Sequence, residues 1–187
     1  MTRLVLIRHG ETDWNAEGRW QGQADIPLNT QGVSASERLA QELVSYPLDA
    51  IYSSDLIRAR QTAQALARAK SMHVKLEPRL REIDQGEWQG LLINQIQSLY
   101  TDVYLKRLQD PWQVAPPGGE TALQVRNRVI EAVDEILTCF PGGTVAIISH
   151  GFTLAMIRVH FQSLPLERIW EMIPGNLELI KINIRDN

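Results

Sequence analysis

Residues 1–15 read MTRLVLIRHGETDWN, and the rest of the chain is organised around this stretch. The apolar run LVLI at residues 4–7 predicts a buried β-strand. Arg8, His9 and Gly10 follow it at once, so a cation, an imidazole and a flexible backbone stand where the strand ends. Ligands of open α/β sheets bind beyond the carboxyl ends of the strands. This end of the strand is therefore expected to hold a ligand.

Strand and helix signals alternate along the rest of the chain, which predicts an α/β domain built on a largely parallel sheet. The expected strands are residues 4–7, 49–53, 74–76, 144–148 and 177–184. The expected helices are residues 30–44, a helix that follows an N-cap at Ser54 and Asp55, two pieces between 91 and 110, 122–137 and 152–161. We expect the 187 residues to form one domain, 1–187, because a single core accommodates a chain of this length.

The composition excludes several classes of protein. A net charge of −3 gives no support to a nucleic-acid surface. No run approaches the ~20 apolar residues of a membrane span, so no membrane partner is expected. The apolar run near the N-terminus is too short for a signal-peptide core, which makes a cytoplasmic location the expectation. The one cysteine, Cys139, excludes an intrachain disulfide and is expected to be buried in the last turn of a helix.

A second strand end and the start of one helix carry side chains suited to binding an anion. The strand at 144–148 runs into Ser149, His150 and Gly151, which repeats the opening pattern of strand, histidine and glycine. Two histidines at two strand ends favour a shared anionic ligand over two structural histidines. Arg58 falls in the first turn of its helix, where a helix N-terminus and an arginine together form an anion site. The alternative is that Arg58 reaches solvent or pairs with Asp55.

Five motifs, in order along nearly the whole chain, resemble one family. They are LIRHGETDWN at residues 6–15, SSDLIRARQTA at 53–63, REIDQGEWQG at 81–90, GGET at 118–121 and SHG at 149–151. The chain resembles the histidine phosphatase superfamily, in the branch of the cofactor-dependent phosphoglycerate mutases and their small phosphatase relatives. The resemblance implies a three-layer α/β/α sandwich around a mostly parallel sheet, the phosphoglycerate mutase-like fold.

The resemblance also implies roles for individual residues. His9 corresponds to the nucleophile that becomes phosphohistidine, and Glu82 corresponds to the acid/base carboxylate, although spacing alone would make Glu82 an ordinary solvated side chain. The implied phosphate pocket consists of Arg8, Arg58 and His150, with Asn15, Gln21, Gly22 and Gly151 as further contacts. No cofactor is implied. The sequence contains no metal-ligand spacing and no Walker-type phosphate loop, so no metal site is expected.

The expected activity is a metal-independent phosphatase that hydrolyses a small phosphate monoester. Mutases of this branch carry added segments that keep water out, whereas the segment between Glu82 and Gly118 is short here, which favours water as the acceptor. Phosphoserine is the leading substrate, although some phosphoserine-type relatives have a histidine where this chain has Gln85. The alternatives are a phosphoglycerate mutase, an α-ribazole, fructose-2,6-bisphosphate or broad-specificity phosphatase, and a non-catalytic regulator that binds a phosphorylated ligand.

The expected partner is a small phosphorylated metabolite, and a homodimer is left open. Two polar loops, residues 11–28 and 79–90, are expected to decide which metabolite binds. Four tryptophans are expected to lie in the loops around the phosphate: Trp14, Trp20, Trp88 and Trp112. They have two interpretations. They either make the entrance apolar and restrict it to small substrates, or pin the loops to the core.

Overall fold

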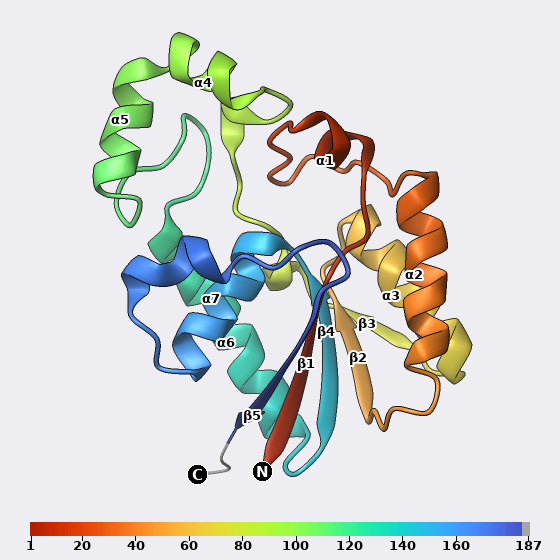
Figure 1. Cartoon of the computed structure of the whole chain (residues 1–187). Helices are drawn as coiled ribbons and strands as arrows, with labels where there is room; N and C mark the ends of the chain where they lie inside the picture. The colour runs from red at the N-terminus through yellow and green to blue at the C-terminus, as the bar shows by residue number, and fades with distance from the viewer. Residues whose placement is uncertain (185–187) are drawn as a thin grey trace.

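The computed structural model describes residues 1–184 of the chain and contains a five-stranded sheet in the order β3-β2-β4-β1-β5. The strands are β1 (Thr2–Arg8), β2 (Ala50–Ser53), β3 (Val74–Leu76), β4 (Thr144–Ser149) and β5 (Leu179–Ile184). Neighbouring strands from β3 to β1 are parallel, and β5 pairs with β1 in the antiparallel direction. The mostly parallel sheet expected from the sequence is therefore confirmed (Figure 1).

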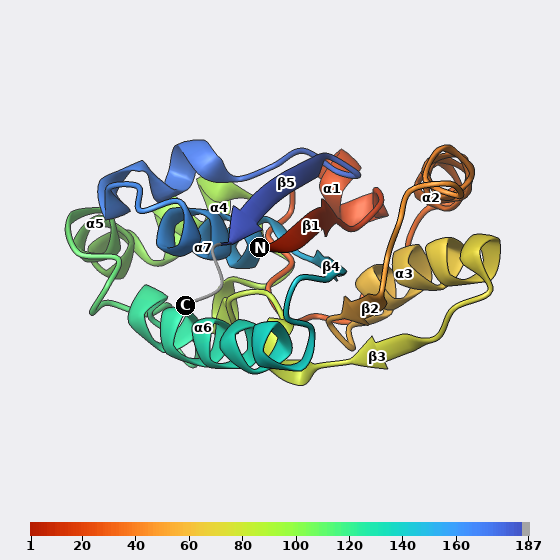
Figure 2. The ribbon, with the colours of Figure 1, turned by 90° about the horizontal axis from the view of Figure 1, so that it is seen from below.

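Helices cover both faces of this sheet, because side chains alternate between the faces along each strand. In β1, Leu4 and Leu6 pack into a core with α6 (Ala122–Cys139) and α7 (Gly151–Phe161). Val5 and Ile7 pack into a second core with α3 (Ile57–Lys70), beside which α2 (Thr30–Glu42) lies. Figure 2 shows these two helix pairs on opposite sides of the strands. The three-layer α/β/α arrangement is confirmed.

The remaining helical segments lie in the connections. They are α1 (Asp13–Glu17), η1 (Pro78–Leu80), η2 (Gly86–Trp88), α4 (Ile93–Leu99), α5 (Thr101–Gln109) and η3 (Leu166–Met172). From the sequence, residues 11–28 are expected to form a loop without regular structure, and the short helix α1 was not predicted. Thr12 begins this short helix with a capping box, in which its hydroxyl accepts the Asn15 N–H and the Asn15 side chain accepts the Thr12 N–H.

Two local predictions about caps and burial are wrong. Ser54 and Asp55 do not cap α3, because the helix begins at Ile57 and its first N–H donates to Asp25 Oδ1 at 2.6 Å, from a loop 32 residues away. Cys139 ends α6 as expected but is exposed. Leu137 and Phe140 on either side of it pack against the core, whereas Cys139 faces solvent.

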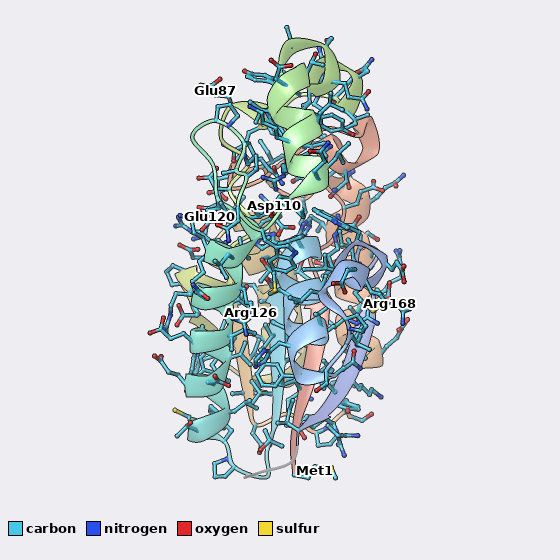
Figure 3. All side chains as sticks on the ribbon, turned by 90° about the vertical axis from the view of Figure 1, so that its left-hand side faces the viewer. Met1, Glu87, Asp110, Glu120, Arg126 and Arg168 are labelled. Atoms are coloured by element: carbon cyan, nitrogen blue, oxygen red, sulfur yellow. The ribbon has the colours of Figure 1, made fainter. Side chains whose placement is uncertain are left out.

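The loops after β1, β2 and β4 gather at one end of the sheet, which lies away from the two chain termini (Figure 1). Helices α4 and α5 stand above this end, and Figure 3 shows Glu87 near them with Met1 at the opposite end of the molecule. Every helix in the described part of the chain is too short or too polar to cross a bilayer.

Candidate active site

A pocket of about 350 Å³ opens at the carboxyl end of the sheet. Most of the residues that the sequence proposed for a site line it: Arg8, His9, Asn15, Gln21, Gly22, Arg58, Glu82 and Gly151. The exception is His150, which is fully buried beside His9 and does not line the pocket. The lining residues come from five separate stretches of the chain, 8–22, 58, 82–85, 151–152 and 170–173, which meet at the predicted sheet edge.

His9 lies at the floor of the pocket and is 2% exposed. Its Nδ1 lies 2.7 Å from the Gly10 carbonyl oxygen, and its Nε2 lies 3.3 Å from Arg58 Nε. A carbonyl only accepts and a guanidinium only donates, so the hydrogen-bond network assigns the proton to Nδ1 and a lone pair to Nε2. Burial lowers the pKa of His9 well below its ordinary value, and the positive charges of Arg58 and Arg8 lower it further. His9 is therefore neutral at pH 7.

Two buried arginines flank this imidazole. Arg58 is 1% exposed and donates through Nη1 to the Ala24 carbonyl and through Nη2 to the Gly22 carbonyl, each at 2.7 Å. Burial lowers the pKa of Arg58 to about 10, so it remains charged at pH 7. Arg8 donates through Nη1 to the Pro174 carbonyl at 2.7 Å, while its Nε is buried and has no acceptor among the described residues. The Arg8 Nε–H is a donor available to an anion.

The start of α7 faces the same pocket, since Gly151 and Phe152 line it. The N-terminus of a helix presents free N–H groups and positive potential to an anion. His150 is the N-cap residue, and its ring centroid lies 5.2 Å from that of His9. Its Nε2 lies 2.8 Å from Ser54 Oγ, and its Nδ1 is buried without a partner among the described residues. Burial, followed by the charge of Arg58, lowers the pKa of His150 well below its ordinary value.

The Glu82 carboxylate lies against the first turn of α7. It accepts the Phe152 N–H at 3.1 Å and the Thr153 N–H at 3.2 Å. The Glu82 carbonyl accepts Arg128 Nη2–H at 2.9 Å, and Arg128 pairs with Glu120 at 2.8 Å. Figure 3 shows Glu120 at the end of α6 that is nearer α4 and α5. The ion pair therefore anchors the loop that carries Glu82.

The four loop tryptophans have different positions. The Trp14 ring packs over Gly90, where a Cβ atom would lie 3.1 Å from Trp14 Cη2. Trp20 lines the pocket, whereas Trp88 is fully buried behind it, with ring centroids 5.8 Å apart. Trp112 lies in a separate groove beside α6 and α7. The pocket wall instead contains Trp170, which packs against Phe152 with ring centroids 5.2 Å apart. The sequence carries no local signal for Trp170, because η3 reaches the pocket only by packing on α7.

Sequence reasoning missed several other residues that support the site. Glu120 stands within the GGET motif, but the motif by itself assigns it no role. Ser54 stands within the motif at residues 53–63, which by itself assigns it no role either. The remaining ones act through contacts across the fold and leave no local pattern: Arg128, Ile173 and Asn176.

This arrangement suits nucleophilic attack on a tetrahedral anion. A neutral imidazole with an unprotonated Nε2 can act as a nucleophile, and two guanidinium groups with a helix N-terminus supply positive potential. A carboxyl group lies in the same pocket for proton transfer. Among residues 1–184, no group of three or more His, Cys, Asp or Glu side chains is placed to hold a metal ion.

Comparisons with known proteins agree with the motifs. A family model described as the histidine phosphatase superfamily (branch 1) matches residues 4–187. Phosphoserine phosphatase 1 of Hydrogenobacter thermophilus is 35% identical over 100% of this chain and 88% of its own length. A probable phosphoglycerate mutase GpmB of Serratia proteamaculans is 34% identical over 84% of this chain and 73% of its own length. The structure of Bacillus stearothermophilus YhfR superposes with a TM-score of 0.89 at 34% identity, covering 99% of this chain and 92% of that one.

Proposed function

Since this chain belongs to the histidine phosphatase superfamily and is a phosphoric monoester hydrolase, we propose that it works without a metal ion through a phosphohistidine at His9. Its fold is the phosphoglycerate mutase-like fold of that family. The observation that carries the proposal is the state of His9. Its proton is held on Nδ1 by the Gly10 carbonyl, and its Nε2 lies in a pocket with two arginines and a carboxyl group.

In the proposed first step, His9 Nε2 attacks the phosphorus of the substrate. The Nε2–P bond forms as the bond from phosphorus to the alcohol oxygen breaks, and the Glu82 carboxyl group transfers a proton to that oxygen. Arg8, Arg58 and the positive potential at the N-terminus of α7 stabilise the charge on the phosphoryl oxygens. The unpaired Nδ1 of His150 is proposed as a further donor, with the Ser54 hydroxyl donating to His150 Nε2.

In the proposed second step, water attacks the phosphohistidine. One water proton passes to the Glu82 carboxylate, the P–Nε2 bond breaks and inorganic phosphate leaves. The Nδ1–H of His9 stays on the Gly10 carbonyl in both steps, so the imidazole returns to its starting state. Glu82 also returns to its protonated form, which closes the cycle.

Phosphoserine is the leading substrate candidate. The support is the relative named phosphoserine phosphatase 1, which aligns with 100% of this chain. The mutase alternative is supported by the relative named as a probable phosphoglycerate mutase. α-Ribazole phosphate, fructose-2,6-bisphosphate and broad specificity remain alternatives among the phosphatases. The proposal includes a cytoplasmic location, with which a single cysteine is consistent. Light scattering would separate a monomer from a homodimer.

The first experiment is steady-state hydrolysis of a chromogenic aryl phosphate in the presence of EDTA. The wild-type protein is expected to turn over, whereas a binding module would not. His9→Ala should abolish turnover and also the acid-labile, alkali-stable phosphoenzyme label, while His73→Ala, at an exposed histidine, should keep both. Turnover that EDTA abolishes would contradict metal independence. Labelling that persists in His9→Ala would contradict the nucleophile.

Glu82→Gln and a substrate panel test the remaining parts. Glu82→Gln should form phosphohistidine slowly or trap it, and unchanged turnover would remove Glu82 from the mechanism. The panel compares phosphoserine with phosphoglycerates, sugar phosphates and nucleotides. A clear preference for phosphoserine supports the leading candidate. Equal rates on all compounds would count against a dedicated substrate, and transfer between phosphoglycerates would favour the mutase.

A further inference from the structure

We infer that Asn176 is a positioning residue for the nucleophile, holding the two peptide groups after His9 so that the proton stays on Nδ1 and Nε2 stays unprotonated. This inference rests on the proposed function, in which His9 Nε2 attacks phosphorus. Asn176 follows η3 and precedes β5, and it is separated from His9 by 167 positions in the chain. It does not line the pocket, so it acts through His9 and not on the substrate.

The Asn176 side-chain amide contacts both peptide groups. Its Nδ2 donates to the His9 carbonyl at 2.9 Å and lies 3.3 Å from the Gly10 carbonyl oxygen. The Gly10 carbonyl is the acceptor for His9 Nδ1–H at 2.7 Å. This carbonyl oxygen thus lies between the nucleophile and Asn176. It holds the proton on Nδ1, while the Arg58 Nε–H faces Nε2 on the other side of the ring.

Gly10 explains why a remote anchor is needed. A Cβ atom at Gly10 would lie 2.8 Å from both the Gly32 carbonyl oxygen and Ser36 Oγ, so only glycine fits. Glycine leaves the backbone free to rotate, and local sterics do not fix the direction of its carbonyl. The Gly10 N–H donates to Thr62 Oγ1 at 3.0 Å, which holds one side of the segment. Asn176 holds the carbonyl side.

The turn that presents Asn176 is itself strained. Leu177 has φ of +59°, in the left-handed region that a branched apolar residue rarely adopts. Its N–H donates to the Arg8 carbonyl at 3.0 Å, while the Arg8 side chain donates to the Pro174 carbonyl. These bonds wrap residues 174–178 around the end of β1. Backbone strain of this kind persists where surrounding contacts hold it, and here it aims an amide at the carbonyls beside the nucleophile.

The test compares Asn176→Asp with the wild type. Aspartate has nearly the same size, but it replaces the NH₂ donor by an oxygen that repels the two carbonyls. We expect kcat on an aryl phosphate to fall by about 10- to 100-fold, because small misplacements of a reacting group cost rates of this order. KM should change little, because the Asn176 side chain does not line the pocket. Asn176→Ala should reduce kcat less, since water can replace the lost donor.

A readout that does not depend on activity is the tautomer of His9, measured by ¹⁵N NMR of the histidine ring nitrogens in the ligand-free protein. The wild type should show a protonated Nδ1 and a bare Nε2 at His9, and Asn176→Asp should show a mixture of the two tautomers. Asn183→Asp is the matched control, because Asn183 is exposed on β5 and its Oδ1 accepts a bond from Arg3 at the other end of the sheet.

Three outcomes would overturn the inference. They are an unchanged tautomer and kcat in Asn176→Asp, an equal loss in Asn183→Asp, and a lower melting temperature with no change in either kinetic constant. If Asn176→Asp fails to fold, the same measurements on Asn176→Ala decide. A failure of the proposed function is recognised separately, because wild-type protein would then show no turnover and no phosphohistidine whatever the tautomer.

Discussion

Acidification from pH 7.5 to pH 5.5 is expected to destabilise this protein, because His9 and His150 are buried in their neutral forms. They are 2% and 0% exposed. Burial is the largest cause that lowers the pKa of each, and the charge of Arg58 is the next. Neither ring can be protonated without placing a cation in a dry site beside two guanidinium groups. Their titration is therefore linked to unfolding.

The sign of this change in stability follows from the number of protons that the folded and the unfolded chain bind. In the unfolded chain each histidine binds a proton near its ordinary pKa of about 6.5, whereas the folded chain binds it only at lower pH. The unfolded state therefore binds more protons below about pH 6.5, and the free energy of unfolding falls as the pH drops from there. The maximal slope is about 1.4 kcal/mol per pH unit for each histidine, or about 2.7 kcal/mol for both.

The pH range in which the two histidines destabilise the protein is separate from the range in which the carboxylates do so. Hydrogen bonds from Arg81 and from Arg79 lower the pKa values of Asp55 and Glu77, so their stabilising contribution is lost only below about pH 4.5. Between pH 6.5 and pH 5 the two buried histidines are expected to dominate. For a domain of this size the slope corresponds to roughly 5–10 °C in melting temperature per pH unit.

The assay is urea unfolding at pH 7.5, 6.5 and 5.5, with the free energy of unfolding extrapolated to water. His9→Asn and His150→Asn each remove one titrating group, so each should reduce the slope by about half, and the double variant should be nearly flat. His73→Asn, at an exposed position, should follow the wild type. Equal wild-type stability at pH 7.5 and pH 5.5, or variant curves parallel to the wild type, would refute the reasoning.

Three further predictions follow from single residues. Arg58→Lys keeps the charge but cannot hold two carbonyls and His9 together, so kcat/KM on an aryl phosphate should fall by about 10²- to 10³-fold; a loss below tenfold would show that the guanidinium fork is dispensable. Arg107 is buried against the Trp88 ring and has a weak contact with the Glu120 carbonyl at 3.4 Å. Arg107→Met should therefore lower the free energy of unfolding in urea by less than about 1 kcal/mol, or raise it. A loss above about 2 kcal/mol would contradict this. Ser71 is exposed at the end of α3 with φ of +53°, so Ser71→Gly should raise the melting temperature by about 2–4 °C in a thermal scan, and a lower value would contradict the cap argument.

The strands and the longer helices were predictable because their signals are local. The run at residues 4–7 is apolar on both sides and becomes β1, with a helix layer on each face. The run before His150 behaves in the same way and becomes β4, which pairs in parallel with β1. Parallel neighbours end at the same edge, so two histidines that each follow a strand must meet there. The family resemblance then added Glu82, which no spacing argument would have chosen.

Contacts between distant segments could not be predicted in the same way. The cap of α3 comes from Asp25, and no rule about residues 54–57 could find it. Trp88 and Trp20 stand in similar polar loops, yet packing buries the first and leaves the second in the pocket wall. Arg128 reaches the Glu82 loop from α6, 46 positions further along the chain.

By itself, the sequence determined the α/β class and placed Arg8, His9 and His150 at strand ends, because hydrophobic periodicity and strand ends depend on neighbouring residues. The family motifs in the same sequence added the three-layer fold and Glu82. Only the tertiary structure decided the state of those groups. His9 is neutral and protonated on Nδ1 because the fold buries it, places Arg58 beside Nε2 and turns the Gly10 carbonyl toward Nδ1. Asn176 approaches that carbonyl from the far end of the chain. Proton positions depend on distances of a few ångströms and on local burial, which packing alone sets.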